Sequence, residues 1–390
     1  AKRTWAENLD MTDPSEPFPW LPLPGHTSAY EWEEYFAYDE LPQTYNRDNG
    51  FLITANSDHT GASFDGNPTN DGFAPQQTDN IHAGYRTARS VELIEATDAH
   101  TRATNEAAIS DVLVMIARDM LPNILAIAND DQTTLTPNGQ KIVNALDGWD
   151  FSCETGLTGN DPVNSPPAGD EVLRQSSGCS AWHELIYDLD KALAQDEPTK
   201  EFPAFVTYFS IMTTDPPRLR PGQDYWDDVT TEGVVEDQYD IVGAAFNEAG
   251  ANLVAELGDN ETQWPWGRKH GFRLRSLLAS LSSVFEAYSN PMGDEAFFAN
   301  RGGMMTVDVA NPRESGFHTS GPSTRFQCEG TSPIQCTIQL PGGQSSHTGS
   351  DNYEDLLQLW LSRTPIELVF DIEQASEDAV ETFDYSSEGD

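Results

Sequence analysis

NGFLITAN, residues 49–56, is the segment from which the fold of this chain can be worked out most directly. The apolar run from Phe51 to Ala55 predicts a β-strand, and Asn56 stands directly after it. Four more short signatures follow in one order along almost the whole chain: AGYRTAR at 83–89, WGRKH at 266–270, GPSTR at 321–325 and LPGGQS at 340–345. These segments are spread along a chain of 390 residues, which is long enough to bury a large core.

The chain falls into three zones by pattern. Residues 1–90 are irregular apart from the predicted strand, residues 91–300 are mainly helical, and residues 301–390 return to strands. Apolar residues recur at three- and four-residue steps from Ile109 to Leu121, which predicts a helix that Pro122 kinks or ends. Further helices are predicted at 182–193, 241–257, 272–288 and 351–362, and strands at 304–309, 324–328 and 336–340. The order strand, helices, strand predicts one α+β domain whose sheet draws on distant segments.

The charge is extreme, with 64 Asp and Glu against 21 Lys and Arg, a net of −43. Such a field repels polyanions, so the charge predicts no nucleic-acid partner and no anionic-membrane partner. No apolar run is long enough to predict a membrane span. Two interpretations of the charge stay open. The protein works in a high-salt organism, or it is an ordinary acidic secreted enzyme.

We expect the melting temperature to rise steeply as a chloride salt goes from about 0.1 M to above 1 M, because the Debye length shrinks from about 10 Å to about 3 Å. Mild acidification to about pH 5 should partly replace the salt, since each protonated carboxylate relieves repulsion. Thermal melts across that salt range test this. A protein equally stable in dilute buffer and in molar salt would favour ordinary secretion.

The four cysteines form two local pairs. Cys153 and Cys179 flank a loop-like stretch, and Cys328 and Cys336 bracket a turn between two strand-like runs. An even number with loop-closing spacing predicts two disulfides and a secreted or periplasmic location. Zinc binding and free buried thiols remain as alternatives, although neither pair has the close spacing of a zinc knuckle.

Familiar catalytic signatures do not explain the chain. The sequence has no HExxH pair, no GxSxG elbow, no GxGxxG fingerprint and no GxxxxGK loop. From motifs of this kind alone, the chain would be an acidic α+β protein of unassigned function.

The ordered signatures resemble the penicillin acylase family of amide hydrolases, in the C-terminal part of its large subunit. The resemblance covers roughly residues 15–375. It implies an αββα N-terminal-nucleophile hydrolase sandwich with a large helical insertion. It also implies that the large subunit's N-terminal Ser attacks an amide, with its own α-amino group as base. Penicillins, acyl-homoserine lactones and N-acylated amino acids are the substrate classes of this family.

The resemblance assigns two catalytic residues here. Asn56 would donate a hydrogen bond to the oxyanion, and Arg86 in the YRTAR stretch would hold Asn56 and the α-amino group. The sequence after Asn56 departs from the usual family pattern. The plainer interpretations are that Asn56 forms a turn and that Arg86 and Arg89 balance nearby carboxylates. His270 is expected to be structural, because an α-amino base needs no histidine.

No cofactor is required by this chemistry, but the family often holds a structural calcium ion near the site. This chain offers Asp58, Asp65, Asp71 and Asp79 as one ligand, with Asp71 favoured by spacing. The other ligands would lie outside the matching segment.

The nucleophilic Ser has no counterpart in the chain, which begins with Ala1. The expected partners are the small subunit and the N-terminal part of the large subunit, with a small-molecule amide as substrate. Three explanations stay open: the chain is a fragment of a longer subunit, a separate polypeptide supplies the Ser, or the protein is an inactive structural or binding member of the family.

Overall fold

The computed structural model describes residues 25–28, 31, 35, 37–41, 43–56, 84–194, 226–228, 230–231, 233–274, 281–285, 296–313, 316–377 and 379. It mixes helices and sheets, so the predicted α+β class is confirmed. The chain forms two compact units. The first unit comprises Ala1–Glu92, Met115–Val143 and Leu185–Ala249, and the second comprises Leu93–Val114, Asn144–Glu184 and Gly250–Asp390.

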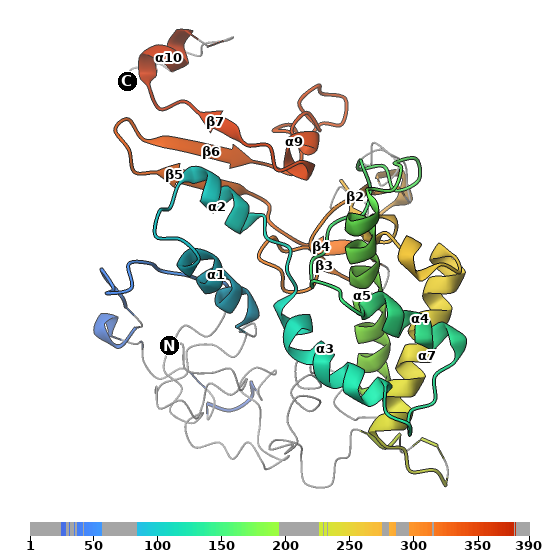
Figure 1. Ribbon diagram of the computed structural model, residues 1–390. Helices are drawn as coiled ribbons and strands as arrows, with labels where there is room; N and C mark the ends of the chain where they lie inside the picture. The colour runs from blue at the N-terminus through green and yellow to red at the C-terminus, as the bar shows by residue number, and fades with distance from the viewer. Residues whose placement is uncertain are drawn as a thin grey trace. The chain divides into compact units, whose positions relative to one another are not determined.

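Helices dominate the first two-thirds of the described residues (Figure 1). They are η2 (Tyr38–Glu40), α1 (Tyr85–Glu95), α2 (Arg102–Ile109), α3 (Met115–Ala128), α4 (Pro137–Leu146), α5 (Asp170–Ala194), α7 (Gln238–Leu257), η3 (Glu261–Gln263), η4 (Trp266–Arg268), α9 (Leu357–Leu361) and α10 (Ile372–Glu377). None of the helices in the described part of the chain combines the length and apolar content needed to cross a bilayer.

The strands lie in the second unit and form three small antiparallel sheets. They are β1 (Gly271–Phe272), β2 (Phe298–Ala299), β3 (Asn311–Pro312), β4 (His318–Ser320), β5 (Arg325–Glu329), β6 (Gln335–Gln339) and β7 (Ile366–Leu368). The largest sheet has the order β5-β6-β7. The predicted strands at 324–328 and 336–340 are confirmed there as β5 and β6.

Long apolar helix faces supply much of the core. The predicted helices at 182–193 and 241–257 are confirmed within α5 and α7, and both are longer than predicted. In α5, Gly178 lets the indole of Trp149 pack against the helix, because a Cβ there would lie 2.5 Å from the indole Cγ. This close packing explains why a glycine stands inside the helix, although glycine lowers helix stability by about 1 kcal/mol relative to Ala.

The helix predicted from Ile109 to Leu121 is wrong at both ends. α2 ends at Ile109, α3 begins at Met115, and α3 runs through Pro122 to Ala128. The break lies where the backbone pairs with a distant segment: Val114 N donates to Phe151 O, and Cys153 N donates to Val112 O. Those bonds hold the intervening residues out of the helix.

Four other predictions are corrected by the structure. Residues 51–55 alternate in burial but are not assigned as a strand, because no ladder partner pairs with them among the described residues. Residues 304–309 form turns, and the helix predicted from 351 is only α9, preceded by turns. Phe272 belongs to β1, so the helix predicted over 272–288 does not begin there; much of that segment lies outside the described residues.

Both predicted disulfides are confirmed. Cys153 pairs with Cys179 at a Cα–Cα separation of 5.3 Å, and Cys328 pairs with Cys336 at 4.1 Å. The second pair occupies directly opposed positions of β5 and β6. Within the described residues no cysteine is free.

Candidate functional site

Asn56 ends the extended segment in the first unit with its backbone in the left-handed region. Its φ is 58°, a conformation that Asn adopts more readily than most other side chains. The residue is exposed. An asparagine that only forms a turn would look the same, so the backbone alone does not assign a role.

Arg86 is the second residue of α1, where its positive charge lies in the first turn of the helix. The first turn of a helix carries partial positive charge, so a cation there costs roughly 0.3–1 kcal/mol. Burial of the guanidinium also lowers the pKa of Arg86. Both effects are unfavourable for an arginine cation, which indicates that Arg86 makes a compensating contact.

That contact is with the end of the extended segment. Arg86 Nη2 donates to Ala55 O at 2.6 Å and to Asn56 Oδ1 at 2.8 Å. Because a guanidinium has only donors, the Asn56 amide must turn its oxygen towards Arg86. The Nδ2 group of Asn56, with its two N–H donors, then faces away from the arginine. Arg86 therefore fixes which end of the amide is presented as a hydrogen-bond donor.

Arg89, on the same helix, belongs to an ion-pair network instead. Its Nη1 lies 2.9 Å from Glu92 Oε2, and Arg118 Nη2 lies 2.5 Å from Glu92 Oε1. The hydrogen bond from Arg118, assisted by Arg89, lowers the pKa of Glu92 to about 2. The structure thus brings Asn56 and Arg86 together and leaves Arg89 with a carboxylate.

The calcium ligand has no structural description. Asp58, Asp65, Asp71 and Asp79 all lie outside the described residues. No step of the chemistry below is therefore assigned to a metal ion.

In the second unit, five buried rings follow one another in what we call the imidazole column: His183, Trp266, His270, His318 and Trp360. Successive ring centroids lie 4.5, 4.5, 5.4 and 6.4 Å apart. His270 Nδ1 donates to Gly316 O at 2.8 Å. This buried position fits the structural role expected for His270.

Burial holds the pKa of every histidine in the imidazole column low. Desolvation lowers the pKa of His183 and His318 to about 4, and that of His270 well below its usual value. Because the folded-state pKa lies below the unfolded value of about 6.5, these groups stabilise the fold fully only above that pH. Their contribution is lost as the pH falls from about 6.5 to about 4.

We therefore expect the free energy of unfolding to fall between pH 7 and pH 5, by about 2 kcal/mol each for His183 and His318, with His270 acting in the same direction. In molar salt the charge repulsion is already screened, and unperturbed carboxylates titrate near pH 4, so under these conditions the histidines dominate the pH dependence between pH 7 and pH 5. Urea unfolding at fixed molar salt measures the slope. His270→Phe, which keeps a stacked ring without titrating nitrogens, should flatten it. A free energy that stays level or rises down to pH 5 would contradict this prediction.

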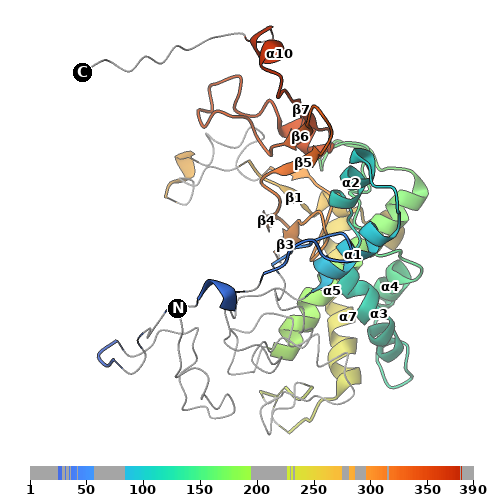
Figure 2. The same ribbon diagram turned by 90° about the vertical axis from the view of Figure 1, so that its left-hand side faces the viewer.

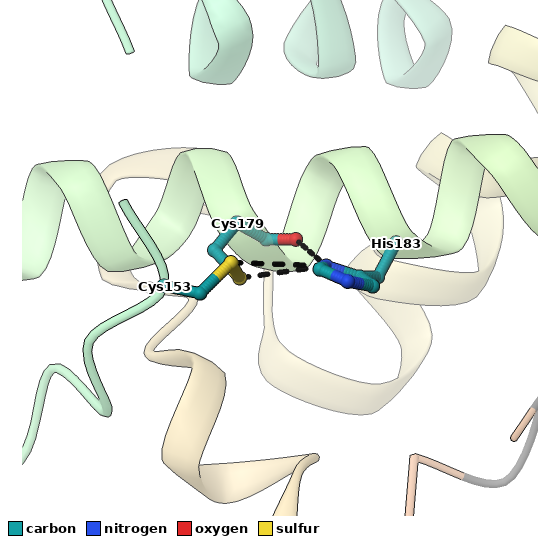
Figure 3. A group of neighbouring side chains, drawn as sticks. All are labelled: Cys153, Cys179 and His183. Atoms are coloured by element: carbon teal, nitrogen blue, oxygen red, sulfur yellow. Dashed lines mark hydrogen bonds between the residues drawn. A yellow bond between two sulfur atoms is a disulfide. The ribbon is translucent and has the colours of Figure 1, made fainter. Parts of the chain in front are cut away.

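His183 also lies against the first disulfide, and the three residues are shown in Figure 3. His183 Nδ1 lies 3.4 Å from Cys179 Sγ and 2.9 Å from Cys179 O. Met304 N donates to His183 Nε2 at 3.0 Å, so Nδ1 carries the proton and donates to Cys179 O. Because the two cysteine sulfur atoms are joined in a disulfide and both ring nitrogens of His183 are hydrogen-bonded, this cluster offers no metal site. The four-residue spacing of Cys179 and His183, which places both on one face of α5, is the sequence signal for this contact.

A buried ion triad connects three distant segments of the second unit. Arg325 Nη2 lies 2.7 Å from Asp308 Oδ1, and Arg363 Nη2 lies 2.6 Å from Asp308 Oδ2. The three side chains are only 1–7% exposed. Both guanidinium groups also lie near the ring of Trp360, at 4.6 and 5.7 Å. Arg325 lies within the strand predicted at 324–328, but no local sequence pattern indicated its contact with Asp308.

The sequence model of the penicillin amidase family matches residues 8–377. A curated relative, the penicillin acylase 2 proenzyme of Pseudomonas sp. (strain SE83), is 20% identical over 364 residues. The match covers 93% of this chain and 42% of the relative. The chain thus spans less than half the length of that proenzyme.

Proposed function

The chain belongs to the penicillin amidase family, and on that premise we propose that it is part of an amide hydrolase that removes an acyl group from an amine. The nucleophilic Ser would come from another polypeptide or from a part of the protein beyond this chain. The fold implied by membership is the αββα sandwich with a helical insertion. The observation that carries the proposal is the hydrogen bond between Arg86 and Asn56.

In the proposed reaction the Ser oxygen attacks the amide carbon, and the proton of the hydroxyl passes to the α-amino group. The carbonyl oxygen becomes an oxyanion, to which Asn56 Nδ2 donates. The α-ammonium group then protonates the leaving amine, and water hydrolyses the resulting ester. An amide suits the role of Asn56 because it donates a hydrogen bond without titrating.

Arg86 acts as a positioning residue in this scheme. It holds the oxygen of the Asn56 amide, so the donor group is already oriented before the oxyanion forms. Pre-oriented donors stabilise developing charge without reorganisation at the moment of reaction. The YRTAR stretch therefore contributes through its second residue, and the remainder of the stretch forms the first turn of α1.

We also propose a cellular location, a saline habitat and a structural calcium ion for this protein. Two disulfides fit an oxidising compartment, secreted or periplasmic. The net charge of −43 fits a saline habitat. A structural calcium ion bound in part by Asp71 remains a proposal that awaits a metal analysis of the native protein.

The test is to isolate the native protein through a C-terminal tag and determine the mass and N-terminal sequence of every stoichiometric polypeptide. We expect a Ser-starting species and release of amine from a penicillin, an acyl-homoserine lactone or an N-acylated amino acid. A single 43.0 kDa chain without hydrolysis would instead support the inactive structural or binding member.

A further inference from the structure

The two disulfides of the chain differ in their access to solvent. Cys153 and Cys179 are both 0% exposed, so the first disulfide lies inside the core. In the second disulfide Cys336 is also 0% exposed, but its partner Cys328 is exposed. A reagent in solution can therefore reach only one of the four disulfide-bonded cysteines without an opening of the fold.

The position of each cysteine in the sheet explains this asymmetry. Cys328 lies on β5, an edge strand of the sheet that the described residues form, and Cys336 lies on the central strand β6 (Figures 1 and 2). The two cysteines are directly opposed across the β5–β6 ladder. Strand β6 has a neighbour on both sides, whereas β5 has one, so the edge cysteine keeps its exposure.

The sheet is also held by contacts that do not involve the disulfide. Arg325, at the other end of β5, is 5% exposed and lies 2.7 Å from the carboxylate of Asp308. It also donates to Trp360 O at 3.2 Å. Strand β6 pairs with β7 from Cys336 to Ile338. Cleavage of the S–S bond would therefore release the end of the hairpin next to its turn and leave the rest of the sheet assembled.

We propose that Cys328 is a site of thiol–disulfide exchange, which small thiols without a net negative charge modify in the folded protein. The thiolate of the small thiol attacks Cys328 Sγ, and the bond to Cys336 Sγ breaks. The electron pair of that bond stays on Cys336 as a thiolate, which takes a proton from water. The product is a mixed disulfide at Cys328 and a thiol at Cys336. The reverse attack by Cys336 on Cys328 restores the original bond and expels the small thiol.

The charge of the protein selects the class of thiol. A net charge of −43 repels a thiol that also carries carboxylates, and Glu329 stands directly beside the reacting cysteine in the sequence. Molar salt screens this repulsion, because the Debye length falls to about 3 Å. This chemistry uses neither Asn56 nor Arg86, so it is independent of the proposed amide hydrolysis.

The experiment incubates the folded full chain in molar salt with excess 2-mercaptoethanol, a neutral small thiol, and quenches samples with acid. Alkylation and peptide mass mapping then locate every adduct and every free thiol. We expect the 2-mercaptoethanol adduct on Cys328 and the alkyl label on Cys336. The disulfide between Cys153 and Cys179 is the internal control and should react about 100-fold more slowly, because a buried bond reacts only after the fold opens. In urea, which unfolds the chain, both disulfides should react at similar rates.

A second series replaces 2-mercaptoethanol by mercaptosuccinate, a thiol with two carboxylates. We expect its rate, divided by its rate on a neutral model disulfide, to be about tenfold lower in dilute buffer and to recover in molar salt. An intact first disulfide in dilute buffer shows that the chain stays folded there. Equal rates for the two disulfides of the folded chain, or an adduct on Cys336 in place of Cys328, would overturn the exchange site. A mercaptosuccinate rate that does not depend on salt would overturn the selection by charge.

Discussion

Replacing Asn56 by Ala should lower the turnover of the complete enzyme by about 100- to 1,000-fold, with little change in KM. The proposed role of Asn56 is to donate Nδ2–H to the oxyanion, a contact that exists only in the transition state. Loss of one such donor typically raises the barrier by about 3–4 kcal/mol. Steady-state release of amine by the reconstituted enzyme gives kcat and KM separately.

Two variants separate this role from backbone strain. Asn56→Gly removes the amide but accepts the positive φ of 58°, so it should lose as much turnover as Asn56→Ala. Asn46→Ala also places Ala at a left-handed position, with φ of 48°, and should retain full activity. Arg86→Met should leave the amide in place but unoriented, with a smaller loss of turnover. Near-wild-type kcat in Asn56→Gly would refute the oxyanion role.

Replacing Asp308 by Asn should lower the free energy of unfolding by about 3–5 kcal/mol. The substitution preserves shape but leaves the charges of Arg325 and Arg363 buried without their counter-ion. Removing one partner from a buried ion pair costs this much because the remaining charge cannot recover its hydration. Desolvation already lowers the pKa of Arg363 to about 10. Urea unfolding at pH 7 and fixed molar salt measures the loss.

Glu171→Gln provides the matched control, since Glu171 pairs with Arg174 at 2.9 Å on the exposed surface of α5. Water screens an exposed pair of this kind, so it adds little to stability, and this variant should unfold almost as the wild type does. Converting the whole triad to apolar residues, with Asp308→Leu, Arg325→Met and Arg363→Met, should recover most of the stability lost in Asp308→Asn. A loss below about 1 kcal/mol in Asp308→Asn would show that the triad is hydrated.

The elements that were predicted correctly depend on local sequence patterns. The elements that were predicted wrongly depend on contacts with residues far away in the sequence. Strands β5 and β6 were predictable because each is a short run in which apolar and polar residues alternate, and each contains one of two cysteines that are eight residues apart. Helix α7 was predictable from the three- and four-residue spacing of its apolar residues. Residues 304–309 have similar β-prone composition, yet Asp308 is held by arginines 17 and 55 residues away. The segment therefore turns to bring its carboxylate to them.

The sequence by itself determined the family, the α+β class, both disulfides and the candidate pair Asn56 and Arg86. These depend on residue identity in short motifs or on local spacing, which a sequence records directly. Only the tertiary structure decided that Arg86 contacts Asn56 Oδ1, and that three histidines stack in one column. It also decided that Arg325, Thr337 and Gln339, three polar residues of the β5-β6-β7 sheet, are buried. Each of these depends on groups tens of residues apart meeting where water is excluded, and local periodicity carries no information about which distant partner satisfies a buried charge or ring.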